Sequence, residues 1–344
     1  METKRRNKWV VGIFATGFLI FILTMGLPAM AKEGKKVFDV KMAHHWPPKH
    51  PCGRLMQKFA DGITKRTSGR MKFSVYPSGQ LFPQGEEASS VGQGLVEFGA
   101  AMGSEMEEVD KGFVLESLMW IWDGYAQMRS LWVTEVGKKH LANAEKGWNI
   151  KILGRNPMGP FLIWTKDKPL MRKEDYAGLK IRAFSAAQPP QYEALGGSAI
   201  NLRTPEVYTA LQSRMIDALP TTPSGMRAYS WWDFLKVANM PYVLYGEAYI
   251  AANANFWNRL PADLQNIILQ VGAEVTKEGT DTITARGEKF MYNDFVKEHG
   301  GKVVTMPASE MIRIKKAILP AWQEIAKDVD PKLWQETLKL IGLQ

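Results

Sequence analysis

The stretch LKIRAFSAAQPPQYEALGGSAINLRTPEVYTALQSRMIDAL, residues 179–219, decides the fold class of this 344-residue chain. Apolar residues alternate with other residues over 179–184, which is typical of a half-buried strand. A helix, a strand, a second helix and a third strand are then expected over 189–197, 198–202, 204–214 and 215–219. Thr204 suits a helix N-cap and Pro205 the first helical residue. This order predicts an α/β fold with crossover connections.

The same order of elements is expected on the N-terminal side of this stretch. Strands are predicted within 37–46, 70–81, 95–102, 149–155 and 161–165, and helices within 52–69 and 84–94. With 45% hydrophobic residues the chain supports a large core, and its length suggests two domains. Because no repeat or low-complexity linker separates them, we expect the two domains to interlock.

A long helix is expected after Pro261, which fits the first helical position, because no proline follows until Pro307. An unbroken helix to Lys297 would be roughly 55 Å long at a rise of 1.5 Å per residue, long enough to cross both domains. A break near Gly279 is the alternative, and we favour the unbroken helix because no proline interrupts it.

The N-terminus has the order of a secretory signal. Residues 1–31 start with a basic segment, continue with an uncharged apolar run and end in AMA. We expect cleavage after Ala31 and a periplasmic protein, with a retained membrane anchor as the alternative. The formal net charge is +9, of which residues 1–31 contribute +3, so +6 remain. Basic and acidic residues are interleaved, which indicates a solvated surface and no nucleic-acid partner.

The sequence carries no motif of a known enzyme class. There is no Gly-x-Ser-x-Gly elbow, no His-Glu-x-x-His and no Walker loop. His44 and His45 are adjacent on a predicted strand, so they point to opposite faces and do not suit one metal ion. Cys52 is the one cysteine, and we expect it to open a helix that packs on the core. We therefore expect a protein that is not an enzyme, with no metal and no cofactor.

Ligand binding is better supported, because ligands of open α/β sheets bind beyond the carboxyl ends of the strands. Arg182 lies in the strand over 179–184, and an arginine is rarely buried without an anionic partner. That partner could be Asp217 or Glu206 of this chain, or a carboxylate that arrives from outside. Candidate contacts in the loops around it are His44, His45, Trp46, Trp122 and Thr222.

These stretches resemble the periplasmic solute-binding subunits of tripartite ATP-independent periplasmic (TRAP) transporters. The most specific matches are the Lys-Ile-Arg of 180–182, the Ala-Leu-Gly of 194–196 and the Pro-Glu-Val-Tyr of 205–208. KRTSGRMKFSVYPSGQL (65–81), VGQGLVEFG (91–99) and WNRLPADLQ (257–265) agree with other parts of the pattern. The resemblance covers nearly all of the chain after the leader, and the order of the motifs makes it specific.

The resemblance implies a two-lobed periplasmic binding protein fold with crossing strands and a long helix that spans both lobes. Lobe I would comprise 32–158 plus about 247–287, and lobe II 159–246 plus about 288–344. The resemblance also assigns Arg182 to the substrate carboxylate, while Glu206 and Asp217 would brace the fold. Tyr208 and Gln212 would pack behind the site.

Two departures from the family pattern bear on the ligand. Many relatives carry a second arginine where Phe161 or its neighbour stands here, and Thr222 takes about the position of an asparagine. Both changes remove polar contacts, while Phe161, Trp164, Trp46 and Trp122 supply flat apolar surface. We therefore expect a monocarboxylate with an apolar or aromatic body. Arg155 or Arg203 could instead restore a dicarboxylate site.

The expected function is that of an extracytoplasmic receptor that binds an organic acid and delivers it to the integral membrane subunits of a TRAP transporter. A receptor for an ATP-driven transporter or a sensor is one alternative. An exported enzyme on the same fold is another, and it would change the mass of a bound substrate.

Overall fold

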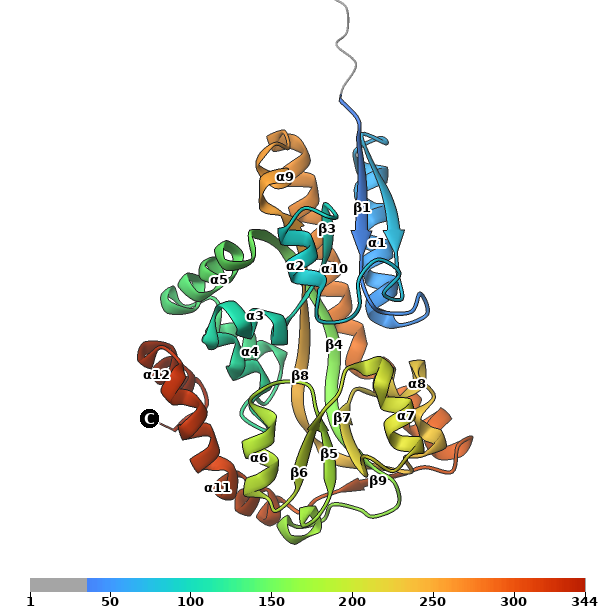
Figure 1. The fold of residues 1–344 in the computed structure, drawn as a ribbon, viewed down its shortest axis with the longest axis vertical. Coiled ribbons are helices and arrows are strands. Elements are labelled where there is room, and N and C mark those ends of the chain that lie inside the picture. Colours follow the sequence, from blue (N-terminus) through green and yellow to red (C-terminus); the bar gives the residue numbers. More distant parts are fainter. Residues whose placement is uncertain (1–35, 344) are drawn as a thin grey trace, which may run out of the picture. The chain divides into compact units, whose positions relative to one another are not determined.

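Two long antiparallel strands, β4 (Ile150–Thr165) and β8 (Val237–Asn253), form the middle of the sheet in the computed structural model, which describes residues 36–343 (Figure 1). The two strands pair along their length, with irregularities between Ile152 and Gly154, Pro157 and Gly159, and Phe161 and Ile163. These bulges let a stretch that is rich in glycine and proline stay in the sheet.

Each end of the β4–β8 pair carries its own group of strands. At one end β8 pairs with β3 (Phe98–Met102), β3 pairs with β1 (Phe38–Ala43), and β1 pairs with β2 (Met71–Tyr76). At the other end β4 pairs with β7 (Ala218–Thr221), β7 pairs with β5 (Lys180–Ala183), and β5 pairs with β6 (Ser198–Asn201). There β8 also pairs with β9 (Lys302–Thr305). One nine-stranded sheet of the described residues therefore connects both groups.

Helices cover this sheet and connect the parallel strands, as the α/β prediction requires. The first six are α1 (Pro51–Arg66), α2 (Glu87–Gly92), α3 (Gly103–Val109), α4 (Tyr125–Leu131), α5 (Glu135–Trp148) and α6 (Gln188–Ala194). The others are α7 (Val207–Gln212), α8 (Pro223–Ala228), α9 (Ala254–Asn258), α10 (Ala262–Lys289), α11 (Ala308–Ile325) and α12 (Pro331–Leu340). The α/β class is confirmed, and the elements expected over 179–219 are present, although α7 begins after a 3₁₀ turn at Thr204–Glu206 and β7 covers Ala218–Thr221 where a strand over 215–219 was expected.

The predicted long helix is confirmed. α10 has 28 residues and continues into a six-residue π-helical segment, Phe290–Phe295. Gly279 does not break the helix, because it is the point where α10 meets Leu55 and Pro157; a Cβ there would lie 2.8 Å from both side chains.

α10 lies directly on the backbone of β4. A Cβ built on Gly272 would lie 2.1 Å from the carbonyl oxygen of Leu153, and one built on Gly154 would lie 2.8 Å from the carbonyl oxygen of Gly272. One turn further on, the Thr276 hydroxyl accepts a hydrogen bond from Arg155 N at 2.7 Å and donates to Arg155 O at 3.0 Å. Small residues and one hydroxyl thus fix this helix to the strand.

The structure tests neither of the two expectations about domains. The expected signal peptide, 1–31, lies outside the described residues. Residues Val37–Gln344 form one compact unit, so the division into lobes at 158, 246 and 287 stays a prediction. Among the residues that the structure describes, no helix is both long and apolar enough to cross a membrane.

The contact between α10 and β4 predicts a large effect of one methyl group. We expect Gly272→Ala to lower the free energy of unfolding by about 1–3 kcal/mol, because backbone atoms on both sides cannot move aside. This loss should appear although alanine favours helices by about 1 kcal/mol over glycine. Urea unfolding followed by circular dichroism measures the change.

Gly287→Ala is the matched control in the same helix. The nearest atom to a Cβ at Gly287 is Cγ of Pro223 at 3.2 Å, which is a much looser contact. We expect this variant to be nearly as stable as wild type. Equal stability of the two variants would contradict the close approach at Gly272.

Candidate functional site

A cavity of about 70 Å³ lies at the carboxyl ends of β1, β5 and β7, beside β4. Its walls include His45 and Trp46, which follow β1, Arg182 of β5, and Thr222, which follows β7. Phe161 of β4 also lines it, as do Tyr229 and Trp231, which follow α8. This is where the sequence places a ligand site. The structure brings five of the predicted residues together here, namely His45, Trp46, Phe161, Arg182 and Thr222.

Arg182 is the cation of this cavity. Its side chain is buried, with 4% of the residue exposed, and its guanidinium lies 5.5 Å from the centre of the Phe184 ring. Nε donates to the carbonyl oxygen of Leu202 and Nη2 to the hydroxyl of Thr204, both at 3.1 Å. Within residues 36–343, Nη1 has no hydrogen-bond partner, so this nitrogen is free to bind a ligand.

No carboxylate of the described chain forms an ion pair with Arg182. Asp217 instead accepts from Lys180 N at 3.0 Å, and Glu206 accepts from Arg203 N at 2.6 Å. Burial lowers the pKa of Arg182 to about 10, while Tyr192, Tyr229 and Glu206 act in the opposite direction. The guanidinium therefore stays charged at neutral pH, buried and without a counter-ion.

His45 offers a second polar group to the same cavity. Its Nδ1 bonds to the buried carboxylate of Glu87, whose other oxygen accepts from Gly85 N at 2.8 Å. The ring also packs against Trp46, with 4.4 Å between ring centres. In a neutral imidazole, the carboxylate favours the tautomer with the proton on Nδ1, and Nε2 is then the accepting nitrogen.

Aromatic rings make up much of the remaining wall. The rings of Phe161 and Phe184 lie 5.4 Å apart, and Tyr229 stacks on Trp231 at 4.9 Å with 19° between the ring planes. The prediction from sequence did not include Tyr229 or Trp231. The feature of the sequence that could have identified them is the aromatic run YSWWDF, residues 229–234, which follows the loop after β7.

Three predicted contacts do not line this cavity. Trp122 is buried in the apolar cluster that also contains Phe161, but it does not line the cavity, and its indole N–H donates to Leu115 O at 2.7 Å. Tyr208 is 42% exposed and packs edge-on against Phe234. His44 lines a groove beside α1 and α10, and burial lowers its pKa to about 4.

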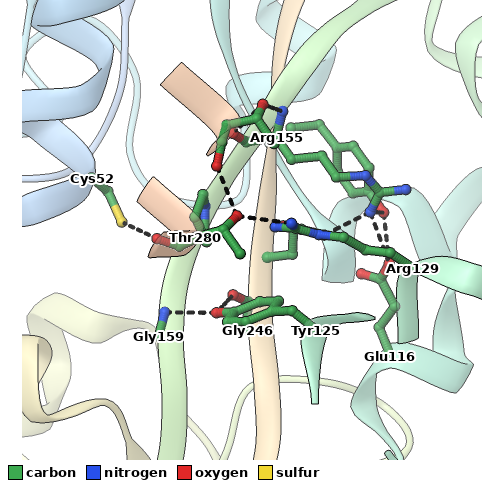
Figure 2. Close-up of polar contacts among 12 residues, drawn as sticks. Cys52, Glu116, Tyr125, Arg129, Arg155, Gly159, Gly246 and Thr280 are labelled. Carbon is green, nitrogen blue, oxygen red and sulfur yellow. Dashed lines mark hydrogen bonds and ion pairs between the residues drawn. The ribbon is translucent and has the colours of Figure 1, made fainter. Parts of the chain in front are cut away.

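Arg155 is held in a buried network and is not available to the cavity (Figure 2). It donates to Glu247 Oε2 at 2.7 Å and lies 3.8 Å from Glu116, whose pKa burial raises to about 7. Arg129 binds the same Glu247 carboxylate and donates to Thr280 at 2.8 Å. Arg203, the other candidate for a second arginine, is exposed and lies 3.9 Å from Glu86.

No metal centre is evident in the part of the chain that the structure describes. Groups of three or more His, Cys, Asp or Glu side chains that could hold an ion are absent from it. Cys52 is buried as the core residue that the sequence predicted, and burial raises the pKa of its thiol well above the usual range. A thiol in this state is a poor nucleophile.

Comparison with known proteins gives consistent matches along the chain. The family model described as bacterial extracellular solute-binding protein, family 7, matches residues 42–328. The chain is similar to the C4-dicarboxylate-binding periplasmic protein DctP of Rhodobacter capsulatus, with 27% identity over 317 residues and 90% of each chain covered.

Solved structures match the fold. DctP7, an extracytoplasmic solute receptor from Bordetella pertussis that binds pyroglutamic acid, has a TM-score of 0.80 at 23% identity, covering 89% of this chain and 100% of that one. A TRAP periplasmic solute-binding protein from Shewanella oneidensis with bound succinate also has a TM-score of 0.80 at 23% identity, with 89% and 99% covered.

The buried network in Figure 2 predicts a strong dependence of stability on Glu247. We expect Glu247→Gln to cost about 3–5 kcal/mol of unfolding free energy, because the partly buried Arg129 and Arg155 would lose the charge of the fully buried carboxylate that they share. Urea unfolding measures it. Glu278→Gln is the control, because Glu278 pairs with Lys58 at the surface and should cost only about 0–1 kcal/mol. Similar losses in both variants would contradict the structural role of Glu247.

Proposed function

Because the chain belongs to family 7 of the bacterial extracellular solute-binding proteins, we propose that it is the periplasmic receptor of a TRAP transporter and that Arg182 binds the carboxylate of its solute. The family consists of binding proteins, so the chain is a receptor and not an enzyme. In this role it captures an organic acid and delivers it to the integral membrane subunits of the transporter. No cofactor is required for such a step.

The observation that carries this proposal is the buried Arg182 without a carboxylate partner. A guanidinium taken out of water without a counter-ion is costly, and a solute carboxylate would supply that counter-ion through charge-assisted hydrogen bonds. Nη1 is the free donor, while Nε and Nη2 are held by Leu202 and Thr204 and fix the orientation of the group. The geometry thus prepares one carboxylate contact in advance.

The walls of the cavity favour a monocarboxylate with an apolar or aromatic body. Phe161 lines the cavity, and Arg155, the candidate second cation, is bound to Glu247. A second carboxylate would lack a strong partner and would be costly to bury. A ring would instead gain on the order of 25 cal/mol per Å² of apolar surface removed from water. His45 Nε2 could accept one hydrogen bond from a hydroxyl or N–H of the solute.

The volume of the cavity requires motion. At about 70 Å³ it is far smaller than the roughly 300 Å³ at which sites for small organic ligands begin. The proposed solute therefore enters only if the walls separate, and the two lobes expected from the sequence would do so by hinge bending. Gln84, whose amide oxygen accepts from Thr204 N at 2.9 Å, marks one contact that such a hinge would break.

A thermal-shift panel tests the class of solute. We expect phenylpyruvate or another aromatic or branched 2-oxo acid to raise the melting temperature, because its carboxylate would bind Arg182 and its body the aromatic wall. Succinate and malate should have little effect. Each acid is also tested on the Arg182→Ala variant. An acid counts as bound in the cavity only if it raises the melting temperature of wild type and not that of this variant. Stabilisation by succinate or malate alone would show that the assigned class is wrong.

Arg182→Ala should reduce the binding free energy of the most stabilising acid of this panel by about 2–5 kcal/mol, because the buried carboxylate of the acid would lose its cationic partner. Titration calorimetry measures the loss, and circular dichroism checks that the variant is folded. Arg203→Ala is the matched control, since it removes an exposed arginine of the next loop and should bind normally. Near-normal affinity in a folded Arg182→Ala protein would refute the carboxylate assignment.

A further inference from the structure

A second, larger pocket lies beside the ligand cavity. It has a volume of about 810 Å³ and is formed by the loop before α1, the helix α8 and the C-terminal end of α10. His50 lines both spaces and separates them. Its Nδ1 accepts from Cys52 N at 3.1 Å at the start of α1, and burial lowers the pKa of this imidazole to about 3. The imidazole of His50 is therefore uncharged at neutral pH.

The charges around this pocket are strongly unbalanced. Five basic side chains and one acidic side chain line it, namely Lys49, Arg54, Arg227, Arg286, Lys289 and Asp294. Asp294 lies 3.5 Å from Arg227. Within residues 36–343, none of the other four cations has a carboxylate within ion-pair distance. Arg54 donates a hydrogen bond to the carbonyl oxygen of Lys49, which carries no charge.

The neighbouring surface of the same two helices is different. Where α1 runs along α10, two of the basic residues have acidic partners: Lys58 pairs with Glu278, and Arg66 with Glu274. The excess of positive charge is therefore greater in the pocket than along this neighbouring surface. Like charges gathered in a concave surface raise the local potential and the local concentration of anions.

We propose that this basic pocket is a second anion-binding site that takes a compact multivalent anion, such as a tricarboxylate or a pyrophosphate. Its cations come from three separate segments, so an anion with several negative groups could contact all three. The guanidinium groups of Arg54, Arg227 and Arg286 suit bidentate contacts to carboxylate or phosphate oxygens. Arg182 does not line the pocket, so this binding does not depend on the proposed function.

Titration calorimetry with citrate and with inorganic pyrophosphate tests the proposal on the purified full-length protein at low salt. We expect saturable binding of at least one of them that weakens as sodium chloride is added. The double variant Arg286→Gln/Lys289→Gln should bind at least about tenfold more weakly, because it removes two charges from the wall. Both side chains are exposed and have no side-chain hydrogen bond to any other residue within 36–343, so the variant should fold.

Two controls locate the anion. Lys315→Gln/Lys316→Gln removes two exposed lysines of α11, outside the pocket, and should bind as wild type does. Arg182→Ala should also bind normally, which would separate this site from the ligand cavity whatever the outcome for the proposed function. If only citrate or only pyrophosphate binds, the result shows whether the site takes tricarboxylates or pyrophosphates. The proposal is overturned if neither anion binds, if Arg182→Ala abolishes binding, or if both double variants lose affinity equally.

Discussion

The pairing of β4 with β8 is the constraint on which the rest of the structure depends. Both groups of parallel strands attach to this pair, one at each end, and α10 lies along it with Gly272 against the backbone of β4. A helix can approach a strand this closely only where neither carries a side chain at the contact. The position of Arg182 follows from the same pair, since β5 reaches β4 through β7 alone.

Much of this fold could be predicted from local patterns, but the central pair could not be. The alternation around Lys180 and the absence of proline between 261 and 307 predicted β5 and α10 correctly. Two strands, 149–155 and 161–165, were expected where β4 is one strand. Pro157, Gly159 and Pro160 lie between them, and such residues end strands in most contexts. Here the partner β8 holds them in one strand by means of bulges. This is a tertiary effect, and no pattern within 150–165 reports it.

The candidate site divides in a similar way. Arg182, His45 and Trp46 were identified from their place at strand ends, and strand ends do meet at this cavity. Trp122 met the same local criterion, yet it does not line the cavity, and its indole N–H donates to Leu115 O. Glu87 was not singled out, although it orients His45 from 42 residues away. Contacts over such separations depend on the sheet order, which the sequence did not reveal.

The π-helical end of α10 has a consequence for how this helix tolerates changes in length. A π turn contains one more residue than an α turn, so Phe290 and Phe295, five positions apart, share one face and lie 6.4 Å apart. Both rings are buried in the same cluster as Trp164 of β4. The segment therefore acts as a register adjustment. It takes up a single extra residue locally, while the upstream turns keep Gly272 and Gly279 aligned on the strand.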